Sequence, residues 1–126
     1  MARYEHLPIF ADAYRLALHI EQQVQGFSGR HRPALGADLR QQCRAVLRLI
    51  IRANSLADRA AVLEQLRVAV EEFLVLTRLA KDVKAFANLK AYETAANLAC
   101  SVGRQTEAWL RSGRQQRPDA GRDAMR

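Results

Sequence analysis

Several features that mark common classes of protein are scarce in this sequence of 126 residues. Its two cysteines, Cys43 and Cys100, show no CxxC or cysteine–histidine spacing, which argues against a disulfide framework or a zinc site and predicts two small buried thiols. No apolar run reaches the roughly 18 to 20 residues that a membrane-spanning helix needs. The N-terminus lacks the basic start, apolar core and cleavage site of a signal peptide. We therefore expect a cytoplasmic protein without a membrane partner.

Motifs for catalysis and cofactor binding are missing as well. The sequence contains no GxGxxG, GxxxxGK[ST], HExxH or GxSxG, and no ExxH pair of the kind that di-iron bundles use. His6, His19 and His31 fall in a terminus, on a polar helix face and in a loop, where we expect solvated side chains. One helical class of ribonucleases pairs an arginine with a histidine, but at a longer spacing than that between Arg15 and His19. We predict a non-enzymatic protein that holds no cofactor and no metal.

The chain does carry a surplus of positive charge, and arginine supplies nearly all of it. The formal net charge is +7, from 17 arginines and 3 lysines against 13 acidic residues. An arginine guanidinium is a flat fork of donors that suits phosphate or carboxylate, whereas a lysine ammonium is a strongly hydrated point charge. A genome of high GC content would give the same bias without a functional reason, and the composition favours neither explanation.

Apolar periodicity predicts four helices and no strand. With 49% apolar residues, the chain can build the core of one domain. The expected helices run from about Leu7 to Gly26, Ala37 to Ser55, Arg59 to Ala85 and Leu89 to Ser112. Connections that are short, apart from the loop over 26–36, favour an all-α, antiparallel up-down-up-down four-helix bundle over residues 1–112. Residues 113–126 are polar and basic, which predicts a disordered tail.

The first and third expected helices have more apolar surface than one bundle seam requires. In the first helix, a stripe that includes Leu7, Tyr14 and Leu18 lies beside a second stripe that includes Ile9 and Leu16. Exposed apolar patches usually mark interfaces between subunits or partners. We therefore expect the protein to self-associate.

The segment "LRQQCRAVLRLIIRANS" places an arginine at every fourth position, at Arg40, Arg44, Arg48 and Arg52. A helix turns about 100° per residue, so the four side chains share one side, nearly opposite the apolar side of the same helix. Like charges four residues apart repel each other by a few tenths of a kcal/mol per pair. We call these four residues the arginine row, and we expect it to have a partner outside its own helix.

Two kinds of partner fit the arginine row. Glu64, Glu71 and Glu72 of the third helix are candidate ion-pair partners, within the bundle or across a subunit interface. The phosphates of RNA or DNA are the alternative, because a step of four residues rises about 6 Å, close to the phosphate spacing along one strand. Few aromatic side chains are expected at the surface, so such binding would use backbone charge and not base stacking. The predicted nucleic-acid contacts are Arg40, Arg44, Arg48, Arg52, Arg78, Lys81 and Lys84.

Four segments resemble one protein family over nearly the whole chain, from Leu7 to Arg111. They are "LPIFADAYRLALHI", "LGADLRQQCRAVLRLIIRANS", "RLAKDVKAF" and "VGRQTEAWLRS". Their order and spacing resemble the bacterial four-helix-bundle family that includes two branches. One branch comprises the accessory variability determinants of diversity-generating retroelements, and the other comprises proteins encoded in intervening sequences of large-subunit ribosomal RNA genes.

The resemblance implies an up-down bundle that assembles into a ring-like homopentamer and has no catalytic residues. In the retroelement branch, it implies a basic surface that binds RNA and DNA non-specifically and a reverse transcriptase as a further partner. Arg52 and Asn54 of "RANS", and Arg78 and Lys81 of "RLAKD", match motif positions of the family. Three alternatives stay open: a nucleic-acid-binding accessory protein, a structural interaction protein whose arginines bridge subunits without binding nucleic acid, and a small helical ribonuclease.

Overall fold

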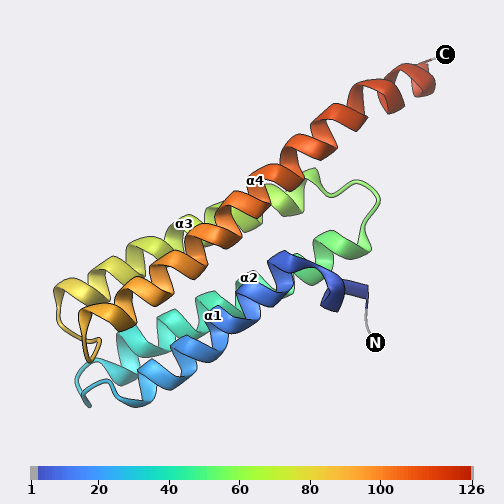
Figure 1. Ribbon diagram of the computed structural model, residues 1–126. Helices are drawn as coiled ribbons and strands as arrows, with labels where there is room; N and C mark the ends of the chain where they lie inside the picture. The colour runs from blue at the N-terminus through green and yellow to red at the C-terminus, as the bar shows by residue number, and fades with distance from the viewer. Residues whose placement is uncertain (1–2, 126) are drawn as a thin grey trace.

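The computed structural model describes the backbone of residues 3–125 and the side chains of residues 4–113. Within this part of the chain, the structure is all-α, with four α-helices and no strand (Figure 1). The helices are α1 (Pro8–Gln25), α2 (Ala37–Ser55), α3 (Ala60–Asp82) and α4 (Leu89–Met125). A 3₁₀ turn, η1 (Arg3–His6), precedes α1, and a π-helical turn, η2 (Arg32–Gly36), leads into α2. The all-α class and the four expected helices are confirmed.

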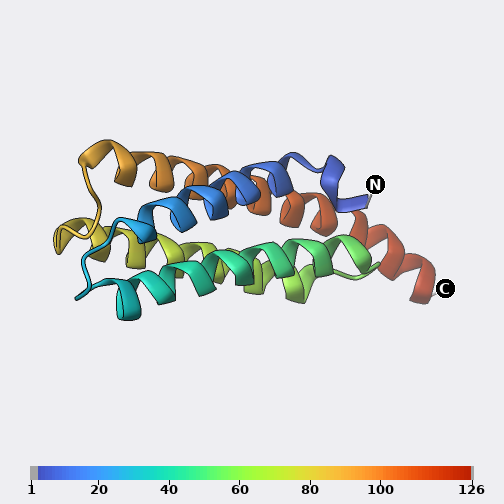
Figure 2. The same ribbon diagram turned by 90° about the horizontal axis from the view of Figure 1, so that it is seen from below.

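The four helices lie side by side along one direction (Figures 1 and 2). The connections from α1 to α2 and from α3 to α4 lie at one end of the molecule, and the connection from α2 to α3 lies at the other. The main packing contacts join α1 to α2 and α4, and α3 to α2 and α4. Each helix therefore has one side toward the core and one side toward the outside. None of the described helices has the length and apolar character needed to cross a membrane.

Buried side chains form two adjoining clusters along the length of the molecule. One cluster is built around Phe27, Phe73 and Phe86, and the other around Ile50 and Leu66. Between α4 and its neighbours the buried residues are small, which allows close approach of the helices; they include Ala91, Ala95 and Ala99. The buried side of α2 is the one that the sequence predicts, with Leu39, Cys43, Val46 and Ile50.

The two cysteines differ in their surroundings. Cys43 is buried in the core, as predicted, and burial is the main reason that its pKa rises to about 12, with the nearby Glu21 carboxylate as the second cause. Cys100 is exposed, so the prediction of a second buried thiol is wrong. The reason is that Cys100 follows the buried Ala99 on α4 and lies about 100° further round the helix, outside the packed face.

The connection between α1 and α2 packs closely against the end of α1. The sequence predicts a loop over 26–36, whereas η2 makes its last five residues, 32–36, helical and continuous with α2. Gly36 is buried there, and a Cβ atom at this position would lie 2.7 Å from Val24 Cγ1. A side chain at this position would therefore displace Val24, so close packing between the start of α2 and the end of α1 favours glycine here.

The turn after α3 is a Schellman motif. The Ala85 N–H donates to the Ala80 carbonyl at 2.8 Å, and the Lys84 N–H donates to the Lys81 carbonyl at 3.0 Å. This geometry places Lys84 in the left-handed region, with φ = 62°. Glycine or asparagine usually occupies that position, so the lysine stores strain. Three residues later in the chain, α4 begins with the Asn88 side chain accepting a hydrogen bond from the Ala91 N–H at 2.8 Å.

The backbone of α4 continues to Met125, beyond Ser112, where the sequence predicts the end of the helix. The predicted disordered tail, 113–126, thus overlaps the last turns of α4, although its sequence includes Pro118, which lacks the N–H that a helix interior uses. The side chains from residue 114 onward lie outside the described residues. Disorder of this stretch in solution stays a prediction.

Candidate nucleic-acid interface

The arginine row lies on the outer side of α2, as its spacing predicts. Arg44, Arg48 and Arg52 are exposed, and Arg40 is half-buried at the edge of the row. The opposite side of the helix supplies buried core residues, so the row cannot turn inward without unpacking α2. The local sequence therefore fixes the direction in which these four charges point.

A single carboxylate on α1 holds the first two residues of the row. Arg44 Nη2 donates a hydrogen bond to Glu21 Oε1 at 2.8 Å. Arg40 Nε lies 2.9 Å from Glu21 Oε2, but its N–H is poorly aimed at that oxygen, so this contact is an ion pair without a good hydrogen bond. The Glu21 carboxylate thus spans two arginines that lie one helical turn apart on the neighbouring helix.

The carboxylate that pairs with the row is thus Glu21, and the predicted intramolecular partners, Glu64, Glu71 and Glu72, have other contacts. Glu64 and Glu71 both bind Arg67 of their own helix, at 2.9 Å and 2.8 Å, and together they raise the pKa of that guanidinium. Glu72 accepts a 3.3 Å hydrogen bond from the Gln42 side chain. The reason is geometric, because the first half of the row points toward α1 and not toward α3.

Arg48 and Arg52 form the second half of the row and differ from the first half in their contacts. Their side chains make no ion pair or hydrogen bond within the part of the chain that the structure describes. Both are exposed, and one helical turn, about 6 Å of rise, separates them. These two adjacent guanidinium groups therefore have no counter-charge among the described side chains.

The other predicted contacts, Arg78, Lys81 and Lys84, lie around the end of α3. Arg78 and Lys84 are exposed, whereas Lys81 is half-buried. The Lys81 ammonium lies 3.8 Å from the Asp82 carboxylate and 4.9 Å from the centre of the Tyr92 ring on α4, a cation–π contact. Lys81 thus has partners within the protein, whereas Arg78 and Lys84 form no ion pair with another described side chain.

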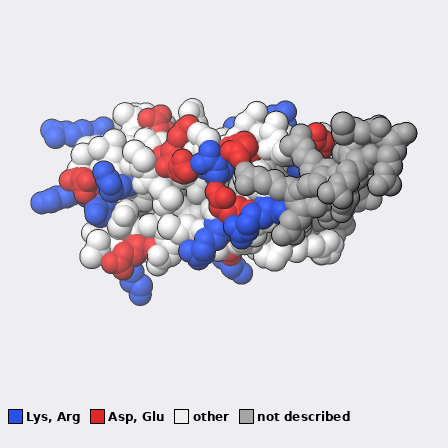
Figure 3. All heavy atoms as spheres, turned by 90° about the horizontal axis from the view of Figure 1, so that it is seen from above, with Lys and Arg blue, Asp and Glu red and all other residues white. Residues whose placement is uncertain are grey.

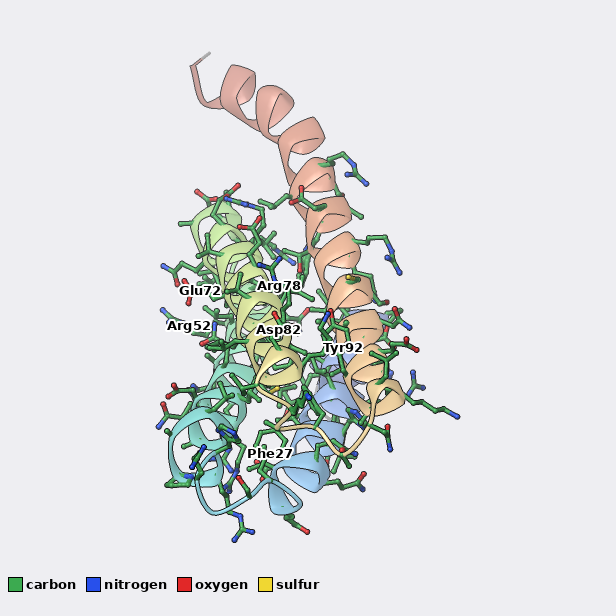
Figure 4. All side chains as sticks on the ribbon, turned by 90° about the vertical axis from the view of Figure 1, so that its left-hand side faces the viewer. Phe27, Arg52, Glu72, Arg78, Asp82 and Tyr92 are labelled. Atoms are coloured by element: carbon green, nitrogen blue, oxygen red, sulfur yellow. The ribbon has the colours of Figure 1, made fainter. Side chains whose placement is uncertain are left out.

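The seven predicted contacts do not form one continuous patch. Figure 4 shows Arg52 on the α2 side of α3, whereas Arg78 lies on the side toward α4. Figure 3, which looks onto α3 and α4, shows acidic and basic side chains interspersed along this face, with basic side chains projecting at the end away from the grey residues. Arg52 of the row and Arg78 therefore lie on different sides of α3.

The described residues hold no group of three or more His, Cys, Asp or Glu side chains that could bind a metal ion.

His19, which the sequence suggests is solvated, is half-buried instead, and its Nε2 lies 2.8 Å from the Ala91 carbonyl oxygen. With Nε2 protonated, the ring donates a hydrogen bond from α1 to α4. This correction arises from helix packing, because Ala91 lies 72 residues away in the chain.

The structure also contains a polar network between α1 and α4 that the sequence does not predict. Asp12 Oδ2 accepts hydrogen bonds from Ser101 Oγ at 2.7 Å and from Gln105 Nε2 at 2.8 Å. Its Oδ1 binds Arg15 Nη1 at 2.9 Å. Nothing in the local pattern distinguishes Asp12 from other polar residues, so only the packing of the two helices identifies it. The network stabilises the contact between α1 and α4 and lies away from the arginine row.

No model of a known protein family matches the sequence, and no curated protein matches it either. The resemblance to the four-helix-bundle family of retroelement and ribosomal intervening-sequence proteins therefore stays a prediction.

Proposed function

We propose that the protein is a non-enzymatic accessory protein that binds the backbone of RNA or DNA through the arginine row. The observation that carries this proposal is the pair Arg48 and Arg52, which are exposed, adjacent and without an ion-pair partner among the residues whose side chains the structure describes. A polyanion would supply the negative charge that these described residues do not. The net charge of +7 favours the approach of such a partner.

The mode of binding follows from the residues of the row. Guanidinium groups bind phosphate oxygens in a bidentate manner but do not read base sequence when they contact only the backbone. The row contains no aromatic side chain on which bases could stack. The proposed binding is therefore strongly salt-dependent and independent of sequence, and it needs no cofactor.

We further infer an antiparallel up-down-up-down bundle that works as a cytoplasmic homo-oligomer. The positions of the three connections at alternating ends of the molecule support the antiparallel order. Tyr14 and Leu18 on the outside of α1 are 50% and 48% exposed, which favours a contact between copies there. A pentamer, and a reverse transcriptase as a further partner, are what the family resemblance implies.

The test compares two variants that lose the same charge from different surfaces. Arg48→Gln/Arg52→Gln removes two charges from the row, and Arg104→Gln/Arg111→Gln removes two exposed charges from α4. The affinity of each protein for a labelled RNA and a labelled DNA is measured by fluorescence anisotropy over a series of KCl concentrations. Each phosphate contact contributes about 0.9 to the slope of log K against log salt, so the row variant should lose about 1.8 units of slope per bound subunit.

Three results would count against the proposal. If the wild type binds neither RNA nor DNA, the proposed function is wrong. If the row variant and the α4 variant weaken binding equally, only net charge matters and the row is not the interface. If the row variant loses its oligomeric mass by light scattering, the arginines bridge subunits, which is the alternative function of the ribosomal intervening-sequence type.

A further inference from the structure

A shallow apolar groove runs along the outside of α3, partly covered by α2. It consists of two adjoining hollows of about 510 Å³ and 460 Å³ that share Val68 and Glu72. The α2 side is formed by Gln42 and Ala45. Because two hollows meet along one helix, the groove has the elongated shape that a helical or extended segment fills.

The floor of the groove continues as an exposed apolar stripe along α3. Val68, Val75 and Leu79 are 39%, 66% and 49% exposed, and they lie seven and four residues apart. This spacing places them on one side of the helix, in the pattern by which helices pack against each other. The stripe covers about three turns, or about 16 Å, and these side chains leave apolar surface in water.

Negative charge lines the groove on a protein that is positive as a whole. Glu64, Glu71 and Glu72 line the groove, and Arg67 of the same helix binds the first two. Among the described lining residues of the two hollows, three carry a carboxylate and none carries a basic side chain, so the groove itself is acidic. It therefore repels a nucleic acid and attracts a basic segment.

A second copy of the protein offers a poor match to the groove. The outer side of α1 has apolar residues, Tyr14 and Leu18, but the adjacent Arg15 already binds Asp12. The outer side of α2 is basic, but among its large apolar side chains only Ile51 is exposed within that helix. Neither of these described faces combines an apolar stripe with free basic flanks.

We propose that this groove binds an amphipathic helix of another protein, whose apolar stripe is flanked by lysine or arginine. The apolar side of the partner covers Val68, Val75 and Leu79, and its basic flanks meet Glu71 and Glu72. Among the described lining residues of the two hollows there is no residue of the arginine row, so the proposed peptide site and the proposed nucleic-acid site use different side chains.

The test uses labelled synthetic peptides and the full-length protein. The first peptide, of about 18 residues or five turns, carries leucines with heptad spacing and lysine or arginine on both flanks. The second has the same composition in an order that destroys the stripe, and the third keeps the stripe but has glutamate flanks. The groove should bind the first peptide at least about tenfold more tightly than either control, because neither control can satisfy both the apolar and the charged surface.

A pair of matched variants locates the binding site. Leu79→Lys changes the apolar stripe that continues from the groove along α3, and Leu18→Lys changes the outer side of α1, at residues that are 49% and 48% exposed. Leu79→Lys should weaken binding of the first peptide about tenfold or more, whereas Leu18→Lys should leave it unchanged. Glu71→Gln/Glu72→Gln should weaken binding and reduce its salt dependence. Circular dichroism of each variant checks that the helices are retained.

Three outcomes would overturn the proposal: equal binding of the scrambled peptide, equal loss of binding by both leucine variants, or no detectable binding of the first peptide. A change in the oligomeric mass of the Leu79→Lys variant would also overturn it, since the groove would then be an interface between copies. The nucleic-acid titration is independent of these results, so failure here leaves the proposed function standing, and the reverse also holds.

Discussion

Removal of the Glu21 carboxylate should strengthen nucleic-acid binding, because this carboxylate competes with phosphates for two arginines of the row. Glu21 occupies Arg40 and Arg44 through contacts of 2.9 Å and 2.8 Å. Glu21→Gln keeps the shape of the side chain but removes its charge. Both guanidinium groups then lose their counter-charge and become available to phosphates, as Arg48 and Arg52 already are.

The expected magnitude follows from the number of phosphate contacts. With two free arginines per subunit, the slope of log K against log salt is about −1.8, and with four it is about −3.6. If the two binding curves meet near 1 M salt, the variant binds about 60-fold more tightly than the wild type at 0.1 M. The cost to folding is small, because partly exposed ion pairs contribute roughly 0 to 1 kcal/mol each to the free energy of unfolding.

Fluorescence anisotropy of a labelled RNA over a KCl series measures both the affinity and its slope. Glu93→Gln is the matched control, because Glu93 is an exposed carboxylate on α4 and its loss changes the net charge by the same amount. The control should raise the affinity slightly and leave the slope unchanged. A triple variant, Glu21→Gln/Arg40→Gln/Arg44→Gln, should return the slope to the wild-type value.

Two results would refute this reasoning. An unchanged slope in Glu21→Gln would mean that Arg40 and Arg44 do not contact phosphates even when they are released. A weaker affinity would mean that Glu21 holds the row in its binding geometry and does not compete with the nucleic acid.

Three further predictions concern stability and reactivity. Thr77 is fully buried and its hydroxyl has no hydrogen-bond partner among the described residues, so Thr77→Val should raise the free energy of unfolding by about 1 kcal/mol in a urea titration. Thr106→Val, which loses a 2.8 Å hydrogen bond to the Val102 carbonyl, should not. Lys84→Gly should stabilise the protein by up to about 1 kcal/mol, because it relieves the positive φ of the Schellman turn; a loss of stability would mean that the lysine side chain makes a contact that outweighs the strain. The pKa of Cys43 is raised from 9.0 to about 12 in the folded state, so the free energy of unfolding should fall as the pH rises from 9 toward 12, and Cys43→Ala should not show this fall. At pH 8, a thiol reagent should modify Cys100 and leave Cys43 unmodified until the protein unfolds.

Much of the fold can be read from local pattern. The period of apolar residues locates all four helices, and the spacing of Arg40, Arg44, Arg48 and Arg52 correctly predicts that they share the outer side of α2. These features depend on residues within a few turns of each other, so the helical repeat alone decides them. The end of α4 is the point where the helix in the structure runs past its predicted boundary.

The candidate site is predictable only in part, because its charge balance depends on contacts between helices. The sequence gives no reason to choose Glu21 over Glu64, Glu71 or Glu72 as the partner of the row. That choice requires the rotation of α2 relative to α1 and α3, which places Arg40 and Arg44 beside α1. The same dependence on packing separates Arg78 from the row.

The sequence by itself thus determines four helices, an outward row of four arginines and a large positive charge. Only the tertiary structure divides that row into two arginines bound by Glu21 and two, Arg48 and Arg52, that pair with no described side chain. The physical reason is that periodicity fixes the direction of a side chain relative to its own helix axis. The rotation of each helix about that axis, and hence the neighbour that each charge meets, is set by the packing of side chains in the shared core.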